Sequence, residues 1–237
     1  MTPRPGQSRL PLAAALAAGL GASLAVAAAL GPPVGSVVLV QRTVLALAAG
    51  QPDRQLRFND PIADGLRVRL VEKESFLKVR FFSDQVESLS GIGIYTLQGQ
   101  SDAALQRGPA RDAAGRLLST VMLYLGRLRL ALRPGGGAQV QTPDAVMGIK
   151  GTAVRLLVDP AAGTFVAVEE GEATVQAKAG GPPARVGAGR WVIVPPGGVP
   201  GRPEALPAPG PRGQIVEDPP LLSTCCARTE PGGPPRR

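Results

Sequence analysis

The sequence predicts an all-β fold, and three observations within residues 142–194 support this class. First, apolar and polar side chains alternate, with Val154, Leu156 and Val158 on one face and Arg155 and Leu157 on the other. Alternation with period two is typical of a strand that buries one face. Second, the runs are short, and third, they are separated by the turn sequences DPAAGT, EEGE, GGPP and GAG. The same alternation predicts that further pairs face the core: Val166 and Val168, Val175 and Ala177, and Trp191 and Ile193.

Earlier segments show the same period. Residues 66–70 and 77–81 alternate Leu, Val or Phe with Arg or Lys, and Leu128, Leu130 and Leu132 alternate with Arg127, Arg129 and Arg133. Each segment is therefore predicted to be a half-buried strand. Residues 37–47 and 91–95 are also compatible with strands. Residues 102–118 are polar, rich in Ala and broken by Gly-Pro. They are predicted to form a loop or at most a short helix.

The first 29 residues are predicted to be a secretory signal peptide. Arg4 and Arg9 precede an uncharged apolar run from Leu10 to Leu30, which contains small residues at the spacing required for cleavage. The alternative is an uncleaved membrane anchor, because a run of about 20 residues is long enough to span a bilayer. In both cases we expect the rest of the chain to lie outside the cytoplasm, either periplasmic or secreted, or anchored to the membrane.

The other boundary lies near residue 195, where the composition changes. Residues 35–195 are predicted to be one all-β domain, and residues 196–237 a disordered tail rich in Pro and Gly. The two cysteines, Cys225 and Cys226, are adjacent in this tail, and neighbouring cysteines form an ordinary disulfide only with strain. Two incidental thiols are favoured over a strained bridge or a bond to another chain.

Composition narrows the function classes. The 237 residues include no His, which excludes catalytic triads with His and imidazole ligands to a metal. We therefore expect no enzyme activity, no metal and no cofactor. The net charge is +8, but aromatic residues make up 3% of the chain, so platforms on which bases could stack are scarce. Together with the predicted compartment, this disfavours nucleic acid as a partner.

Several short motifs occur in a fixed order: Thr142-Pro143, GIKGT ending in Gly151-Thr152, Thr164 with two following valines, Glu170-Gly171, and Ala188-Gly189. In this order and spacing the chain resembles the FecR family of bacterial extracytoplasmic proteins. The resemblance implies a compact β-roll or short β-solenoid, whereas the strand pattern alone equally allows a β-sandwich. It also implies sensing or relaying of signals through protein contacts. About nine residues precede the apolar run, so we expect the extracytoplasmic module of the family without its cytoplasmic anti-sigma domain.

The candidate binding residues follow from these patterns. GIKGT lacks the spacing of a phosphate loop and is predicted to be a corner, with Gly151 permitting the turn and Thr152 starting a strand. Glu169, Glu170 and Glu172 are predicted to surround a solvated turn rather than a cation site. A partner strand is expected at an exposed strand edge. The candidate partner-binding residues are Gly151, Thr152, Val166, Val168, Glu170, Gly171, Arg127 and Arg129.

Basic side chains form a second candidate surface. They occupy the outward positions of the alternating segments and would make one positive face if those strands were neighbours. Such a face would bind cell wall or an anionic membrane surface, which defines the alternative function of an envelope structural protein. An ordinary solvated surface, balanced by nearby acids, explains the same pattern. The residues concerned are Arg67, Arg69, Lys78, Arg80, Arg127, Arg129 and Arg133.

Overall fold

A computed structural model describes residues 33–48, 50–82, 93–111, 117–133 and 136–207. These residues form strands and turns without a helix, which confirms the predicted all-β class. The predicted leader and residues 208–237 of the predicted tail, with both cysteines, lie outside the described residues. Within the described part of the chain, no segment has the helical length and apolar character that crossing a membrane would require.

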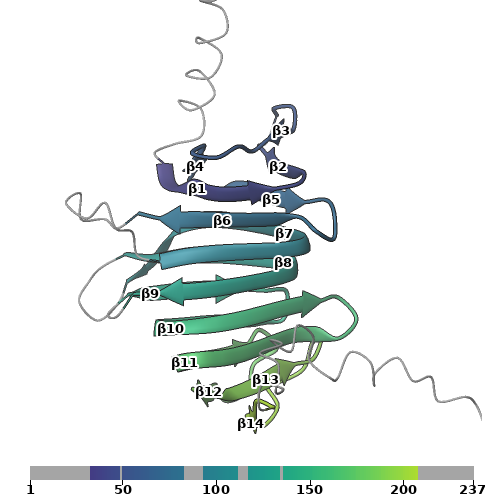
Figure 1. Ribbon diagram of the computed structural model, residues 1–237. Coiled ribbons are helices and arrows are strands. Elements are labelled where there is room, and N and C mark those ends of the chain that lie inside the picture. Colours follow the sequence, from purple (N-terminus) through teal and green to yellow (C-terminus); the bar gives the residue numbers. More distant parts are fainter. Residues whose placement is uncertain (1–32, 49, 83–92, 112–116, 134–135, 208–237) are drawn as a thin grey trace, which may run out of the picture.

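The strands are stacked along the long axis of the molecule, from β3 and β4 at one end to β14 at the other (Figure 1). Neighbouring strands pair antiparallel, except that β8 and β9 are parallel. The strands are β1 (Pro33–Gln41), β2 (Val44–Leu47), β3 (Arg54–Gln55), β4 (Pro61–Ala63), β5 (Leu66–Leu70), β6 (Phe76–Phe81), β7 (Gly93–Arg111), β8 (Leu117–Leu132), β9 (Gly137–Gln141), β10 (Ala145–Asp159), β11 (Gly163–Ala177), β12 (Ala184–Gly187), β13 (Arg190–Val194) and β14 (Glu204–Ala205).

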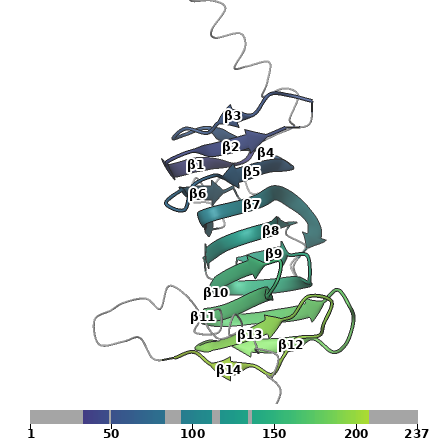
Figure 2. The same cartoon turned by 90° about the vertical axis from the view of Figure 1, so that its right-hand side faces the viewer.

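Four long strands, β7, β8, β10 and β11, each change partners near the middle. In β10, residues 146–150 pair with β9, whereas residues 153–158 pair with β8. The register breaks between Lys150 and Ala153, so Gly151 and Thr152 lie at a corner of the backbone, as predicted. The strand continues through this corner, however, so the prediction that Thr152 starts a strand was wrong. The side view shows β7 curving around in this way (Figure 2). Each long strand therefore contributes to two layers of the fold.

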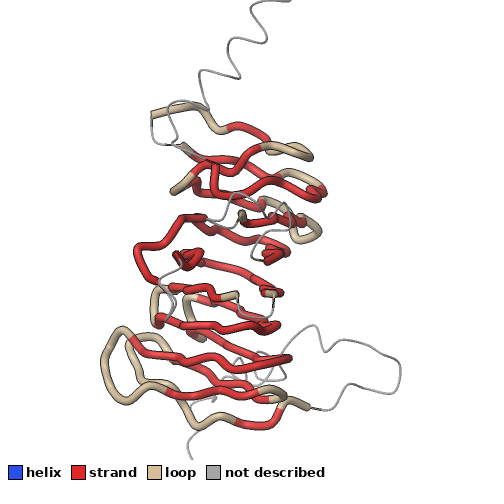
Figure 3. The backbone as a smooth tube through the Cα atoms, turned by 90° about the vertical axis from the view of Figure 1, so that its left-hand side faces the viewer, coloured by secondary structure: helices blue, strands red, loops and turns tan. Residues whose placement is uncertain are grey.

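We call these two layers A and B. Together they form a solenoid-like stack of short rungs, the β-roll architecture that was predicted, with turns along its sides (Figure 3). Layer A contains β1, β4, β6, residues 93–98 of β7, 127–132 of β8, 153–158 of β10, 164–168 of β11, β13 and β14. Layer B contains β2, β3, β5, residues 102–107 of β7, 119–125 of β8, β9, 145–150 of β10, 172–177 of β11 and β12.

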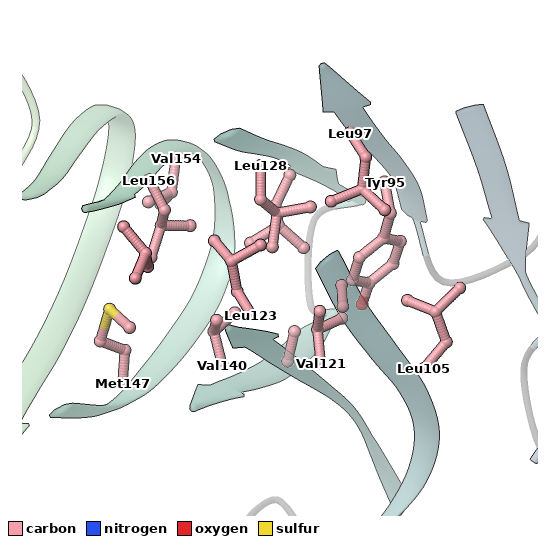
Figure 4. Close-up of a cluster of buried hydrophobic side chains, with 14 of the residues drawn as sticks. Tyr95, Leu97, Leu105, Val121, Leu123, Leu128, Val140, Met147, Val154 and Leu156 are labelled. Carbon is pink, nitrogen blue, oxygen red and sulfur yellow. The ribbon is translucent and has the colours of Figure 1, made fainter. Parts of the chain in front are cut away.

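The hydrophobic core fills the space between the two layers (Figure 4). Met147 and Ile149 of β10 are buried in layer B, whereas Val154 and Leu156 of the same strand are buried in layer A. The buried positions thus change from odd to even numbers across the corner. The irregular backbone at the corner makes this change possible, because an extra residue in a strand reverses which side chains point inward.

Glycine is required at the corner of β8. Gly126 has a φ of 94°, a conformation that L-residues rarely adopt, and a Cβ atom there would lie 2.2 Å from Oγ of Ser101. The same corner residue separates Leu123, which is buried in layer B, from Leu128, which is buried in layer A. The tight turn therefore brings two apolar faces of one strand onto a single core.

Buried polar groups connect the layers. The hydroxyl groups of Tyr95 in layer A and Ser119 in layer B are hydrogen-bonded across the core, and burial raises the pKa of Tyr95. Toward the other end, Thr164 of layer A contacts Thr142, which lies in the turn between β9 and β10, with an Oγ1–Oγ1 distance of 2.8 Å. Both threonines are buried, so this hydrogen bond gives their hydroxyl groups a partner in place of water.

Two predictions about secondary structure were wrong. Residues 102–118 were expected to be a loop or short helix, but the first part continues β7 to Arg111 and the last part begins β8 at Leu117. Trp191 and Ile193 were expected to face the core, but Val192 and Val194 are the buried residues. All four consecutive residues are apolar, so alternation alone could not identify the inward pair. The sheet also continues past residue 195, because β14 pairs with β13.

Candidate functional site

The outer face of layer A carries a row of apolar side chains across three strands. Leu157 of β10 pairs with Phe165 of β11, which pairs in turn with Ile193 of β13. Trp191, two residues before Ile193, places its ring centroid 5.4 Å from that of Phe165. Because their neighbours in sequence point into the core, these four half-buried side chains point away from it. We call Leu157, Phe165, Trp191 and Ile193 the apolar row.

Backbone contacts hold the tryptophan in place. Its indole Nε1 donates a hydrogen bond to the carbonyl oxygen of Ala205 at 3.1 Å, and Trp191 pairs with Glu204 in the sheet. The segment that follows β13 bonds back as well, with the amide nitrogen of Gly201 2.9 Å from the carbonyl oxygen of Ile193. These bonds cover the edge of β13 and fix the indole on the outer face of the sheet.

Charged residues border the apolar row. Glu169 lies between two arginines, with one carboxylate oxygen 2.7 Å from Nη2 of Arg129 and the other 2.7 Å from Nε of Arg155. Arg127 pairs with Leu157 in the sheet and is therefore next to the row. The border is thus polar and holds its side chains in defined positions, whereas the row itself is apolar. This contrast is typical of a protein-binding surface, with an apolar centre and a polar rim.

A second charged cluster lies on the opposite outer face, in layer B. Asp102 accepts hydrogen bonds from Arg67 at 2.7 and 2.8 Å and from Arg69 at 3.2 Å. Burial raises the pKa of the Asp102 carboxyl, but the bonds and charges of the two arginines outweigh it, and the pKa lies below its usual value. The same bonds raise the pKa of Arg67, whose guanidinium lies 4.8 Å from the ring centre of Tyr124.

The predicted basic residues therefore do not form one positive face. Arg67 and Arg69 belong to β5 in layer B, whereas Lys78, Arg80, Arg127 and Arg129 belong to β6 and β8 in layer A. The expectation required their strands to be neighbours, but β5 and β6 pair with different halves of β7. The sheet also places Asp102 and Glu169 among the arginines. Arg127 and Arg129 remain on the outside of layer A, as predicted.

The other predicted binding residues fall into two groups. Val166 and Val168 are 0% exposed in the core, so a partner cannot contact their side chains without opening the fold. Gly151 and Thr152 lie beside Glu170 and Gly171, because the corners of β10 and β11 are adjacent in the sheet. Glu170 and Gly171 are exposed, as predicted, but they lie within β11 and not in the predicted turn. The structure thus brings the corner residues together but separates them from the two valines.

Sequence reasoning missed the apolar row. Its signal was present in the four consecutive apolar residues of β13, since a strand with both faces apolar must expose one apolar face or cover it. No protein-family model matches this chain, and a comparison with curated proteins likewise finds no match.

Proposed function

We propose that this chain is a non-enzymatic, extracytoplasmic module of FecR type that binds a protein partner and acts in signal relay or as a scaffold. The sequence resemblance supports this class of function, and the apolar row indicates where the partner binds. Trp and Arg are enriched among the residues that contribute most to the affinity of protein interfaces. Here the chain's single Trp lies beside Phe165 on an outer face, bordered by Arg127 and Arg129.

The geometry explains how such a surface would bind. The row consists of residues from paired strands, so its shape is fixed before a partner arrives and little conformational entropy is lost on binding. Its four residues are half-buried, so part of each side chain is accessible to a partner. A partner that buries this surface gains the hydrophobic contribution of two aromatic rings, while the Arg–Glu pairs at its border select for a matching pattern of charge.

The proposal is tested by site-specific crosslinking in cells that produce the full chain. A photoreactive residue at position 193 is expected to give a specific crosslinked protein, whereas one at position 124 is not. Tyr124 is the matched control because it is an outward side chain of layer B with 38% exposure. Trp191→Ala is then expected to abolish the crosslink at position 193, and Tyr124→Ala to leave it unchanged. Equal crosslinking at both positions would contradict the proposal.

The alternative function, attachment to cell wall or an anionic membrane through basic residues, is supported in a narrower form. The basic side chains on the outside of layer A number fewer than the sequence predicts, and Glu169 pairs with Arg129. Arg80 of β6 and Arg133 after β8 have no acidic partner within the part of the chain that the structure describes.

A further inference from the structure

A groove lies on layer A across β6, β7 and β8, away from the apolar row. Its volume is about 390 Å³, within the range of about 300–1,000 Å³ that is typical of small-molecule sites. Arg80 pairs with Ile94 and Ile94 with Ala131, so these three residues form one row across the strands. Strands are about 4.8 Å apart, which places the β6 and β8 sides of the groove about 10 Å from each other. The described residues that line it are Arg80, Gly93, Ile94, Ala131, Leu132 and Arg133.

The two arginines of this groove differ from those described above. Arg67 and Arg69 are paired with Asp102, and Arg129 and Arg155 with Glu169. Among the described residues, no carboxylate pairs with the guanidinium of either Arg80 or Arg133. Both side chains are exposed and stand at the two sides of the groove. Two positive charges beside one cavity, with no carboxylate partner among the described residues, attract an anion.

The chemistry of the groove indicates which anion fits. A carboxylate carries one negative charge, so it would balance only one of the two guanidinium charges. A phosphate monoester carries three acceptor oxygens and a charge of about −1.5 to −2 at pH 7, which matches two arginines. Between these cations lies Ile94, which is 38% exposed and offers an apolar floor. The ligand is therefore expected to combine a phosphate group with an apolar portion.

We propose that this groove binds a phosphate monoester that carries an alkyl chain, with the phosphate held by Arg80 and Arg133 and the chain lying over Ile94. The site differs from the apolar row in its strands and in its chemistry, so it goes beyond the proposed protein-binding function. A protein-binding face on β10, β11 and β13 and a small-molecule site on β6, β7 and β8 can be occupied together.

The test is isothermal titration of the full chain with decyl phosphate below its micelle-forming concentration, and separately with inorganic phosphate. Saturable binding of one decyl phosphate is expected, with weaker binding of inorganic phosphate. Arg80→Gln and Arg133→Gln should each weaken decyl phosphate binding about tenfold, because each removes a charged hydrogen-bond donor. Ile94→Ser should weaken binding of decyl phosphate but not of inorganic phosphate.

Arg185→Gln is the matched control, since it removes the same charge from an exposed position of β12 in layer B. It is expected to leave binding unchanged, and a circular dichroism spectrum verifies the fold of each variant. The proposal is overturned if decyl phosphate does not bind, or if Arg80→Gln and Arg133→Gln have no larger effect than Arg185→Gln. Equal affinity for the two phosphates would overturn the role of Ile94.

Discussion

Two adjacent leucines of β10 provide a direct test of the layered architecture. Leu156 is 2% exposed and packs in the core, where it is paired with Leu128 and Val166 in the neighbouring strands. Leu157 is half-buried and belongs to the apolar row on the outer face. Both residues are leucines in the same strand. Replacing each with alanine therefore compares how much stability is lost on the inner and on the outer face of the sheet.

The expected magnitudes differ several-fold. Removing a fully buried leucine side chain costs about 2–5 kcal/mol, because apolar contacts are lost and a cavity remains. Leu156→Ala is therefore expected to lower the free energy of unfolding by about 3 kcal/mol. A change of 1 kcal/mol shifts the Tm of a domain of this size by about 2–4 °C, which gives a decrease of roughly 6–12 °C. Leu157→Ala loses part of that apolar contact and opens no cavity, so about 1 kcal/mol is expected.

The assay is denaturant unfolding monitored by far-ultraviolet circular dichroism, with both variants and the unmodified chain measured together. This signal reports on the strands, whereas fluorescence of Trp191 would change with the environment of Leu157 itself. Equal losses for the two variants would refute the assignment of faces, and a larger loss for Leu157→Ala would reverse it. Agreement would support the register of β10 with both of its neighbours.

Two further predictions concern a corner and a buried charge. Gly126→Ala should destabilise the fold by at least about 2 kcal/mol, because Gly126 has a positive φ and an added Cβ atom would contact Ser101. Gly148 has open space around it, so Gly148→Ala should change the free energy of unfolding by less than about 0.5 kcal/mol in the same denaturation assay. Similar losses for both would show that the corner is not constrained. Because the folded-state pKa of Asp102 is lowered, its pairing stabilises the fold above the unfolded pKa of about 3.9 and is lost as the pH falls through the folded value. Thermal melts from pH 6 to pH 2 should thus show a smaller acid-induced loss of stability for Asp102→Asn than for the unmodified chain, and identical slopes would contradict this reasoning.

The local pattern predicted the strands that have one apolar and one polar face. Leu66, Val68 and Leu70 of β5 are buried between exposed arginines, as their alternation indicates. The pattern failed at residues 102–118 for a physical reason. Small alanines suffice to fill the core where β7 lies close to its neighbours, so Ala103 is fully buried although the segment is not strongly apolar. Tertiary pairing with β5 and β8 overrides the weak local preference.

The charge pairs could not be predicted for a different reason. Arg67 and Asp102 are 35 residues apart in sequence, and Arg129 and Glu169 are 40 apart. Whether such residues meet depends on which strands pair and in which register, and alternation within a single strand contains no information on either. The sequence indicated correctly that these arginines point outward. It could not show that each pair of outward arginines shares an acid, or that β5 and β6 lie in opposite layers.

The residues on which the proposed FecR-type resemblance rests act mainly within the fold. Thr142 and Thr164 join the two layers, and Asp144 lies 3.3 Å from the hydroxyl of Thr164. Gly151 and Gly171 lie at adjacent corners of β10 and β11. Such residues specify how the strands stack, and proteins that stack strands alike need them whatever they bind. The chemistry that selects a partner must then come from outward residues that the resemblance does not include, and this is why the apolar row is the place to test first.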